Sequence, residues 1–458
     1  MLKYQPKPLN PTTTITTVPG DKSISHRSII LASLTKQDIK IEKCLMSTDC
    51  LNTINIFQQL GVSINYQKQT GCVDINGVGL HGLKAPKTQL NVGNSGTAIR
   101  LISGILAGQS FNSTLTGDAS IQTRPMKRII LPLTQMGAKI TGNDLHNEKC
   151  PPLHITGTAL QGITYELPIA SAQVKSCILL AGLFANGKTT VIETKATRDH
   201  TEIMLKGMGV DIKQIPLKSQ GRSITVIPPK TLSYRNHQTL TIPADFSSAA
   251  FLIVLALITK IDLTLHNINL NPTRSSLLNV LEGFGIPVKE TSDITEFFDG
   301  ILIKRSASTL GEPAGDIRIN ITNTLLKNGT VPTELIPLII DEIPILAIYG
   351  LFALGTLTVA EAEELRVKES DRIATIVAMI SKLGGTITET SAGFYLQGNP
   401  DHTVSDHVCI DPKFDHRIAM AAIIASVASQ TPIQLLDSEC IETSFPNFMD
   451  IIQQLYRT

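Results

Sequence analysis

Polar and apolar positions along this chain follow one layout that occurs six times. A short polar motif precedes an apolar helix, a β-branched strand follows, and a second helix ends at a glycine before another strand. Glycine suits the left-handed conformation that commonly ends a helix. Because both markers recur together in steps of about 72–77 residues, with one longer step before the fifth unit, the pattern predicts a sixfold βαβαβ repeat. The polar motifs begin at Asp21, Asn94, Ser171, Asp245, Asp341 and Asp415, and the glycines are Gly61, Gly137, Gly209, Gly285 and Gly384.

Each polar motif is expected at a helix N-terminus, where unpaired N–H groups and the helix dipole favour an anion. Taken singly, a basic residue near such an end is typical of a solvated surface. Four cations at one repeat position are unfavourable without an anion nearby, so the chain is predicted to bind small anions. These four are Arg124, Arg198, Arg274 and Lys368, and Lys22, Arg27, Arg100, His416 and Arg417 lie at the first helices.

The composition fits a globular protein of two or three domains: 458 residues, 42% hydrophobic and 17% charged. A net charge of +1 and the absence of tryptophan give no case for nucleic acid or for an anionic membrane. The longest apolar run, 249–259, is too short to cross a bilayer, and no targeting segment precedes Asp21, so a cytoplasmic monomer is expected. The seven cysteines are scattered without zinc spacing, so no metal is expected.

The repeats divide into two predicted domains. Units one to three fill 20–241, and units four to six, together with 1–19, fill 242–458. Pro19-Gly20 and Pro243-Ala244 are the expected hinges. The stretch between Asp293 and Glu334 is expected to be a loop-rich excursion on the surface.

Seven ordered motifs resemble the class II 5-enolpyruvylshikimate-3-phosphate synthases. No single motif is specific, but each stands at the same point of its repeat. The resemblance implies two similar inside-out α/β barrel domains, each of three repeat units, that close over their ligands. The motifs are Gly20-Asp21-Lys22-Ser23, Gly93-Asn94-Ser95-Gly96-Thr97, Ser171-Ala172-Gln173-Val174-Lys175, Arg198-Asp199-His200-Thr201-Glu202, Asn271-Pro272-Thr273-Arg274, the run from Leu365 to Arg372, and the run from Asp415 to Met420.

The family transfers the enolpyruvyl group of phosphoenolpyruvate to the 5-hydroxyl of shikimate 3-phosphate and releases phosphate, without a cofactor. It serves the shikimate pathway to aromatic amino acids and is the target of glyphosate. By resemblance, Asp341 takes the hydroxyl proton, Glu369 handles the methylene proton, and Lys22 stabilises charge as phosphate departs.

The resemblance also assigns the substrate contacts. Lys368, Glu369 and Arg372 are spaced to share one face of a helix, and His416 is either a substrate contact or a buried second-layer residue. Shikimate 3-phosphate is expected at Lys22, Ser23, Arg27, Ser171, Ala172, Gln173, Arg198, Asp341 and Lys368. Phosphoenolpyruvate is expected at Lys22, the Gly96 backbone N–H, Arg124, Gln173, Arg372 and Arg417.

Some positions depart from the class I pattern and fit class II, namely Leu101, Ala172, Arg198 and Thr443. The nearest alternative is the enolpyruvyl transferase that acts on UDP-N-acetylglucosamine. That family typically has asparagine after the lysine and a cysteine in the second-unit loop, whereas this chain has Ser23 and no cysteine in 117–124. A non-catalytic relative would lack Lys22, Asp341 or Glu369, and a structural repeat scaffold would not concentrate charge at equivalent positions.

Overall fold

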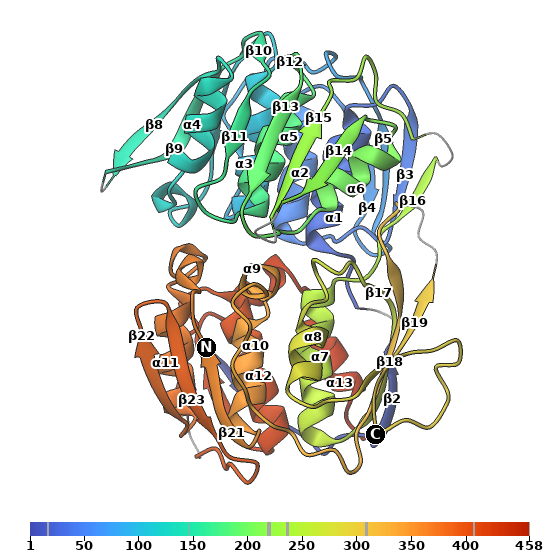
Figure 1. Ribbon diagram of the computed structural model, residues 1–458, viewed down its shortest axis with the longest axis vertical. Coiled ribbons are helices and arrows are strands. Elements are labelled where there is room, and N and C mark those ends of the chain that lie inside the picture. Colours follow the sequence, from blue (N-terminus) through green and yellow to red (C-terminus); the bar gives the residue numbers. More distant parts are fainter. Residues whose placement is uncertain are drawn as a thin grey trace. The chain divides into compact units, whose positions relative to one another are not determined.

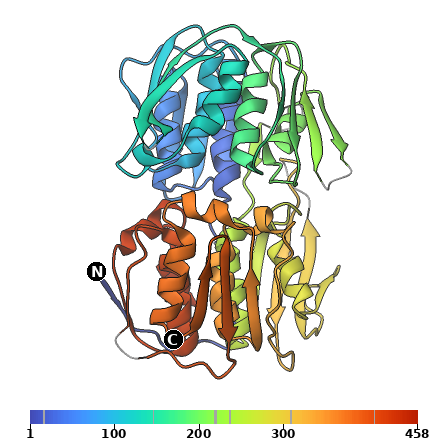
Figure 2. The same cartoon turned by 60° about the vertical axis from the view of Figure 1, so that its left-hand side comes forward.

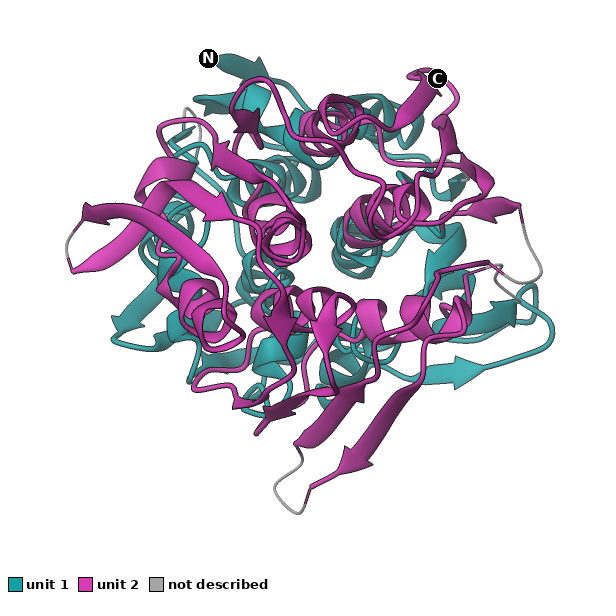
Figure 3. Ribbon diagram, turned by 90° about the horizontal axis from the view of Figure 1, so that it is seen from above, with its two compact units in different colours: residues 1–19, 243–307, 313–458 teal, residues 20–242, 308–312 magenta. Residues whose placement is uncertain are grey.

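The computed structural model describes residues 1–15, 18–145, 147–217, 221–234, 238–306, 310–405 and 408–457. The chain forms two compact units (Figures 1 and 3). The first-half unit contains 20–242 together with 308–312. The second-half unit contains 1–19, 243–307 and 313–458. Each unit has its own hydrophobic core.

Three buried helices that contact one another form the centre of the first-half unit: α1, α3 and α5. The strands surround them in mixed sheets (Figure 3). The helices are α1 (Lys22–Ser33), α2 (Thr48–Gln59), α3 (Gly96–Ala107), α4 (Lys127–Gln135), α5 (Ala172–Gly182) and α6 (His200–Gly207), with a 3₁₀ turn η1 (Ile121–Thr123). The sheets are β16-β3-β5-β4, β6-β7-β9-β8, β11-β13-β15-β14 and β10-β12. Their strands are β3 (Asp38–Glu42), β4 (Ser63–Gln67), β5 (Cys72–Asn76), β6 (Leu90–Asn91), β7 (Asn112–Thr116), β8 (Lys139–Leu145), β9 (Glu148–Thr156), β10 (Leu160–Gln161), β11 (Thr164–Glu166), β12 (Ala185–Asn186), β13 (Thr189–Glu193), β14 (Ile212–Pro216), β15 (Arg222–Val226) and β16 (Thr239–Thr241).

The second-half unit repeats this plan around α7, α10 and α12, which also contact one another. Helix α7 is buried from Phe246 to Leu257, as expected for an apolar helix at the centre of a domain. Its helices are α7 (Phe246–Thr259), α8 (Leu277–Gly283), α9 (Ile336–Ile339), α10 (Ile343–Leu351), α11 (Arg372–Lys382), α12 (His416–Ser429) and α13 (Phe448–Gln454), with 3₁₀ turns η2 (Glu363–Val367) and η3 (Ser438–Thr443). The sheets are β18-β19-β20-β17-β2, β21-β23-β22 and β1-β25-β24. Their strands are β1 (Leu2–Tyr4), β2 (Thr12–Ile15), β17 (Asp262–Asn269), β18 (Val288–Glu290), β19 (Gly300–Ser306), β20 (Ala314–Asn320), β21 (Gly355–Val359), β22 (Thr386–Thr390), β23 (Gly393–Gly398), β24 (Val408–Ile410) and β25 (Ile433–Leu435).

The predicted helix ends are confirmed. The glycines that follow α2, α4, α6, α8 and α11 all have φ between 80° and 96°, in the left-handed region that glycine enters without steric cost. The second helix is followed by a hairpin in several repeats, for example β4 and β5, which adds one strand to the predicted pattern. The inside-out α/β arrangement predicted from the resemblance is confirmed.

Two strands pair with the opposite half of the sequence. Strand β2 precedes α1 but pairs in parallel with β17, and β16 precedes α7 but pairs in parallel with β3. The N-terminal strand β1 pairs with β25 and so supplies a strand to the sixth repeat, which ends at α13 (Figure 2). Hydrogen bonding therefore accounts for the membership of 1–19 in the second-half unit.

The expectation of a surface excursion between Asp293 and Glu334 is wrong. Strands β19 and β20 lie in this stretch, and β20 is an inner strand of its sheet, paired with both β19 and β17. Between them, Leu310 and Glu312 are buried, and the segment that contains them belongs to the first-half unit. The glycines and prolines of this stretch had indicated loops because they interrupt the apolar pattern.

Candidate active site

Most of the polar motifs act as helix N-caps. A side-chain oxygen of Asp21, Ser95, Ser171, Asp245 or Asp415 accepts a hydrogen bond from a backbone N–H in the first turn of α1, α3, α5, α7 or α12. The fifth motif differs, because α10 begins after Glu342 without a side-chain cap hydrogen bond. The Asp341 carboxylate instead faces arginine side chains.

Arg372 is the centre of the charged group in the second-half unit. Its side chain is 1% exposed, and it donates to Asp415 Oδ2 at 2.7 Å, Asp341 Oδ1 at 2.9 Å and Glu369 Oε2 at 2.5 Å. Burial alone would lower the pKa of the guanidinium, but the three carboxylates together raise it above its usual value. Asp341 and Glu369, the two residues predicted to transfer protons, therefore bind the same arginine.

Arg417 is a second cation at Asp341. Its NH1 donates to the Asp341 carbonyl at 3.2 Å, and its Nε lies 3.5 Å from Asp341 Oδ1. Arg417 enters α12 beside the capping residue Asp415, and His416, the first residue of α12, is buried. The structure thus brings Asp341, Glu369, Arg372 and Arg417 together.

The structure places Lys368 outside the helix that the spacing suggested. The turn η2 ends at Val367 and α11 begins only at Arg372, so Lys368, Glu369 and Arg372 do not share one continuous helix. The expected helical face is wrong, although the contact between Glu369 and Arg372 forms. Lys368 Nζ lies 3.9 Å from Glu364 Oε1, and burial lowers the pKa of its ammonium.

Helix α1 carries the first group of predicted ligands in the first-half unit. Lys22 Nζ lies 2.5 Å from Asp49 Oδ2, an acidic residue in the first turn of α2 that the sequence reasoning missed. The only sequence signal for Asp49 is its place after a serine that opens a helix. The pKa of buried His26 is lowered well below its usual value by burial and by the charges of Lys22 and Arg27. The start of α1 is therefore electropositive around a neutral imidazole.

Arg27 is 4% exposed, and among the described residues its hydrogen bonds go to neutral oxygens. It donates to Thr201 Oγ1 at 2.7 Å, to Ser176 Oγ at 2.8 Å and to the Ser23 carbonyl at 3.0 Å. Burial lowers the pKa of Arg27 to about 10, so it stays charged at neutral pH. A buried cation held by hydroxyls rather than by a carboxylate is suited to an anionic ligand.

The starts of α3 and α5 form a second group in the first-half unit. Arg100 donates to Gln173 Oε1, Gln173 Nε2 donates to Thr97 Oγ1 at 3.0 Å, and Arg124 donates to Asn94 Oδ1. A methyl group on Gly96 would lie 3.0 Å from the NH1 atoms of both Arg100 and Arg124. The Gly96 backbone N–H at the start of α3 thus lies among guanidinium groups, including Arg100, to which the sequence reasoning gave no ligand.

The loop before α6 places Arg198, and the start of α5 places Ser171 and Ala172. The Ser171 hydroxyl accepts from the Val174 N–H at 3.5 Å, and Ala172 is the first residue of α5. The residues beside Arg198 are fixed by Arg222, which donates to the Thr197 carbonyl at 2.6 Å and lies 3.4 Å from Asp199 Oδ2. The sequence reasoning missed Arg222 because no motif contains it.

Arg274 occupies the same repeat position as the predicted ligands but has internal partners. It is 1% exposed and lies 2.8 Å from Asp245 Oδ1 and 2.9 Å from Glu342 Oε1. The Ser247 hydroxyl also donates to this Glu342 oxygen. Arg274 therefore stabilises the second-half unit through buried ion pairs.

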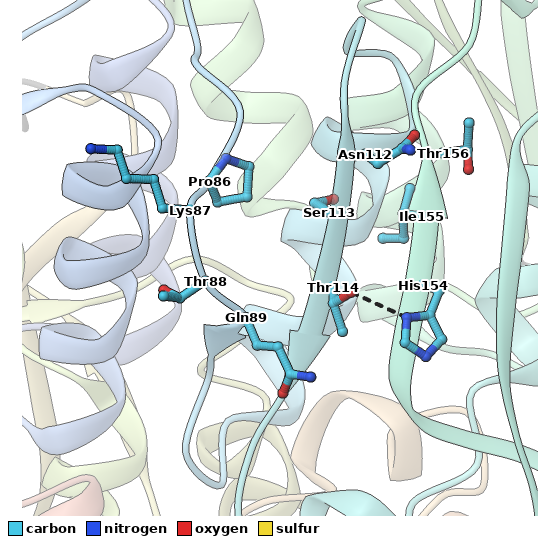
Figure 4. A pocket seen from close by; sticks show the side chains of 10 residues that line it. All are labelled: Pro86, Lys87, Thr88, Gln89, Asn112, Ser113, Thr114, His154, Ile155 and Thr156. Atoms are coloured by element: carbon cyan, nitrogen blue, oxygen red, sulfur yellow. Dashed lines mark hydrogen bonds between the residues drawn. The ribbon is translucent and has the colours of Figure 1, made fainter.

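A shallow pocket of about 490 Å³ lies on the sheet that contains β7 and β9 (Figure 4). Its side chains include Lys87 and His154, and the His154 Nδ1 lies 3.1 Å from Thr114 Oγ1. None of the predicted ligands lines it. The charged groups described above, rather than this pocket, carry the chemistry expected of an anion site.

Burial disfavours the reactive thiolate form of several cysteines. Burial raises the pKa of Cys177 to about 12, and it also raises that of Cys150, which contacts the Thr123 carbonyl beside the second-unit loop.

Among the described residues, no helix combines the length and apolar character that a bilayer crossing requires.

Comparisons with known proteins agree along nearly the whole chain. The family model for EPSP synthase (3-phosphoshikimate 1-carboxyvinyltransferase) matches residues 6–452. The 3-phosphoshikimate 1-carboxyvinyltransferase of Ruthia magnifica is 43% identical over 99% of this chain and 98% of its own length, and that of Alkalilimnicola ehrlichii is 42% identical over 95% and 91%.

Solved structures extend the agreement to the fold. An EPSP synthase from Acinetobacter baumannii has a TM-score of 0.82 at 39% identity and covers 100% of this chain and 98% of its own. The enolpyruvyl transferase NikO from Streptomyces tendae has a TM-score of 0.70 at 13% identity, over 99% of this chain and 96% of its own, and shows a shared fold. With matches of this length and identity, the chain belongs to the EPSP synthase family.

Proposed function

We propose that this chain transfers the enolpyruvyl group of phosphoenolpyruvate to the 5-hydroxyl of shikimate 3-phosphate, with Asp341 and Glu369 as its proton-transfer groups and Lys22 stabilising charge. The observation that carries this assignment is the shared contact of both carboxylates with Arg372, at 2.9 and 2.5 Å. A base and an acid that act on one small substrate must lie within reach of it together.

The reaction needs two proton movements. Asp341 accepts the proton of the 5-hydroxyl as its oxygen attacks the C2 atom of phosphoenolpyruvate, and Glu369 delivers a proton to the methylene carbon. The tetrahedral ketal then loses phosphate, and removal of a proton from the new methyl group regenerates the enol ether. Lys22 donates to the departing phosphate oxygen, because its ammonium has three N–H donors and can keep its contact with Asp49 while it binds the phosphate.

Phosphoenolpyruvate is assigned to Lys22, the Gly96 N–H, Arg124, Gln173, Arg372 and Arg417. A guanidinium has five N–H donors, and Arg372 uses four in its hydrogen bonds to carboxylates among the described residues. The remaining donor, on NH1, is available to the carboxylate of the substrate. Arg417 supports the same role, because its Nε contact with Asp341 is long at 3.5 Å and can be exchanged.

Shikimate 3-phosphate is assigned to Lys22, Ser23, Arg27, Ser171, Ala172, Gln173, Arg198, Asp341 and Lys368. The hydroxyl partners of Arg27 support the placement of the phosphate, because they leave its charge without a directly bonded carboxylate among the described residues. The lowered pKa of Lys368 supports a ligand there as well, because an anion would restore the favoured charged form.

We assign the chain to class II on the sequence features Leu101, Ala172, Arg198 and Thr443. We also propose that 20–241 and 1–19 with 242–458 act as separate domains in a monomer. The seven cysteines are all free thiols, which supports a reducing compartment such as the cytoplasm.

Phosphate release from phosphoenolpyruvate tests the proposal directly. Purified protein is assayed with shikimate 3-phosphate, with UDP-N-acetylglucosamine and with neither acceptor, each with and without a strong chelator. Release with shikimate 3-phosphate alone, unchanged by the chelator, is the expected result. Release only with UDP-N-acetylglucosamine would contradict the assignment.

A further inference from the structure

A short piece of the second half of the sequence is built into the first-half unit. Leu310 lies in the hydrophobic core of that unit, and Glu312 is 1% exposed. Glu312 Oε1 lies 2.8 Å from Nδ1 of His200, which is also 1% exposed. A carboxylate buried to this degree is costly unless it is paired, so the Glu312–His200 contact is a specific feature of the packing.

His200 is the first residue of α6, directly after the loop that carries Arg198. On the N-terminal side of Arg198, the side chains of Thr197 and Arg222 fix the same loop. The Thr197 hydroxyl donates to Glu193 Oε2 at 2.6 Å, and Arg222 donates to Glu193 Oε1 at 2.5 Å. With the Glu312–His200 contact, Arg198 is flanked by anchored residues on both sides.

The same turn of α6 also positions Arg27. Thr201, the residue after His200, accepts from Arg27 Nε at 2.7 Å and donates to Ser176 Oγ at 2.7 Å. Glu202, one residue further, lies 2.8 Å from buried Lys175 Nζ. A displacement of the start of α6 would therefore move the partners of Arg27 together with the loop of Arg198.

We propose that the Glu312–His200 contact is a positioning contact that fixes the start of α6 and thereby orients Arg198 and Arg27 for the phosphate of shikimate 3-phosphate. This inference rests on the proposed function. It assigns both residues to the affinity for that substrate and not to phosphoenolpyruvate, three of whose proposed ligands, Arg124, Arg372 and Arg417, lie on other elements.

The negative charge of Glu312 and its hydrogen bond to His200 have opposite effects on the affinity for a phosphate. A carboxylate near a cation reduces its attraction for a phosphate, and Glu312 is one of the acidic groups that act on Arg27. Glu312→Gln removes the charge but keeps an oxygen that accepts from the imidazole, whereas Glu312→Ala removes both. The two variants therefore separate anchoring from charge.

The experiment measures KM for each substrate and kcat in full-length wild type, Glu312→Ala, Glu312→Gln, His200→Ala and the Glu312→Ala/His200→Ala double variant. Glu290→Gln is the matched control, because Glu290 is an exposed glutamate that pairs with Arg305 at 2.6 Å. Circular dichroism and melting temperature establish that each variant is folded at the assay temperature.

Glu312→Ala is expected to raise KM for shikimate 3-phosphate about tenfold, with kcat and KM for phosphoenolpyruvate within about twofold of wild type. Glu312→Gln and Glu290→Gln should leave KM for shikimate 3-phosphate within about twofold or lower it. The double variant should match Glu312→Ala, because both changes remove one interaction.

Unchanged KM for shikimate 3-phosphate in Glu312→Ala would overturn the inference, and so would an equal rise for both substrates. If Glu312→Ala does not fold, Glu312→Asp gives the same test, because aspartate keeps the charge but is one methylene shorter and so holds its carboxylate further from His200. The wild-type arm reports on the proposed function separately, since a wild type inactive with shikimate 3-phosphate refutes that proposal before any variant is compared.

Discussion

Arg372→Lys tests the group that holds both carboxylates proposed to transfer protons. Lysine keeps the positive charge but loses the planar fork that reaches Asp415, Asp341 and Glu369 at once. Because the lysine ammonium is compact, it can reach only about one of these three carboxylates. The substitution therefore removes two charge-assisted hydrogen bonds, each with a net contribution of about 1.5–3 kcal/mol.

The structure decides how much of this loss reaches stability. Asp415 is fully buried and keeps its cap on α12, whereas the side chains of Asp341 and Glu369 are 17% and 26% exposed, so water can replace part of the lost contacts. We therefore expect a total loss below the sum of the two contributions, about 2 kcal/mol. For a unit of this size that corresponds to a melting temperature lower by roughly 4–8 °C.

The kinetic loss should be larger, because Asp341, Glu369 and the substrate carboxylate would all lose the same donor. Removal of one preorganised donor typically costs about 10²–10³-fold in turnover, and we expect kcat/KM to fall by that much. Steady-state phosphate release and differential scanning fluorimetry measure the two effects. Arg305→Lys is the control, since Arg305 pairs with Glu290 at the surface and should change neither quantity. A lower melting temperature with kcat/KM within threefold of wild type would show that Arg372 is only structural.

Three further predictions concern the same groups. Asp341→Asn should lower kcat about 10²-fold or more while substrates still bind in equilibrium titrations, because an amide cannot accept the proton that the proposed base takes. Near wild-type turnover would remove Asp341 from the mechanism. Gly96→Ala should raise KM for phosphoenolpyruvate, and it should raise the inhibition constant of glyphosate by a larger factor, because the new methyl would lie 3.0 Å from Arg100 and Arg124. Equal increases in the two constants would place Gly96 outside the inhibitor-specific part of the site. KM for shikimate 3-phosphate should rise in wild type as the pH increases through the lowered pKa of the Lys368 ammonium, which is proposed to bind the anion, but not in Lys368→Arg. Parallel profiles would exclude Lys368 as the titrating group.

The sequence predicted the features that depend on residues close to one another along the chain. Helix ends and caps depend on residues within a few positions of one another, and the left-handed glycines and the Asp21, Ser95, Ser171, Asp245 and Asp415 caps agree with the pattern. The contact between Glu369 and Arg372 also spans only three residues. Its neighbour Lys368 shows the limit, because a turn η2 replaces the helix that the spacing suggested.

Most of the missed features join residues that are distant in the sequence. The Glu312–His200 contact spans 112 positions, and Lys22 pairs with Asp49 across two helices. The pairing of β2 with β17 and of β16 with β3 depends equally on the packed fold. Such contacts leave no periodic trace, because any acidic residue at the surface of a unit looks the same in a sequence as one that is buried against a partner.

Arg274 and Asp341 together show how equivalent repeat positions acquire different roles. Arg274 matches the predicted ligands in position, but Asp245 and Glu342 neutralise it inside the second-half unit. Glu342 stands beside Asp341 and is completely buried by this pairing, so the fifth motif is anchored through its second residue. Helix α10 begins after Glu342 without a side-chain cap hydrogen bond, which elsewhere contributes about 1 kcal/mol of helix stability. The Asp341 carboxylate is held by Arg372 and Arg417, which the proposed mechanism places at the substrate. In that mechanism, the copy of the motif that departs from the structural role of the others is the one that supplies the base.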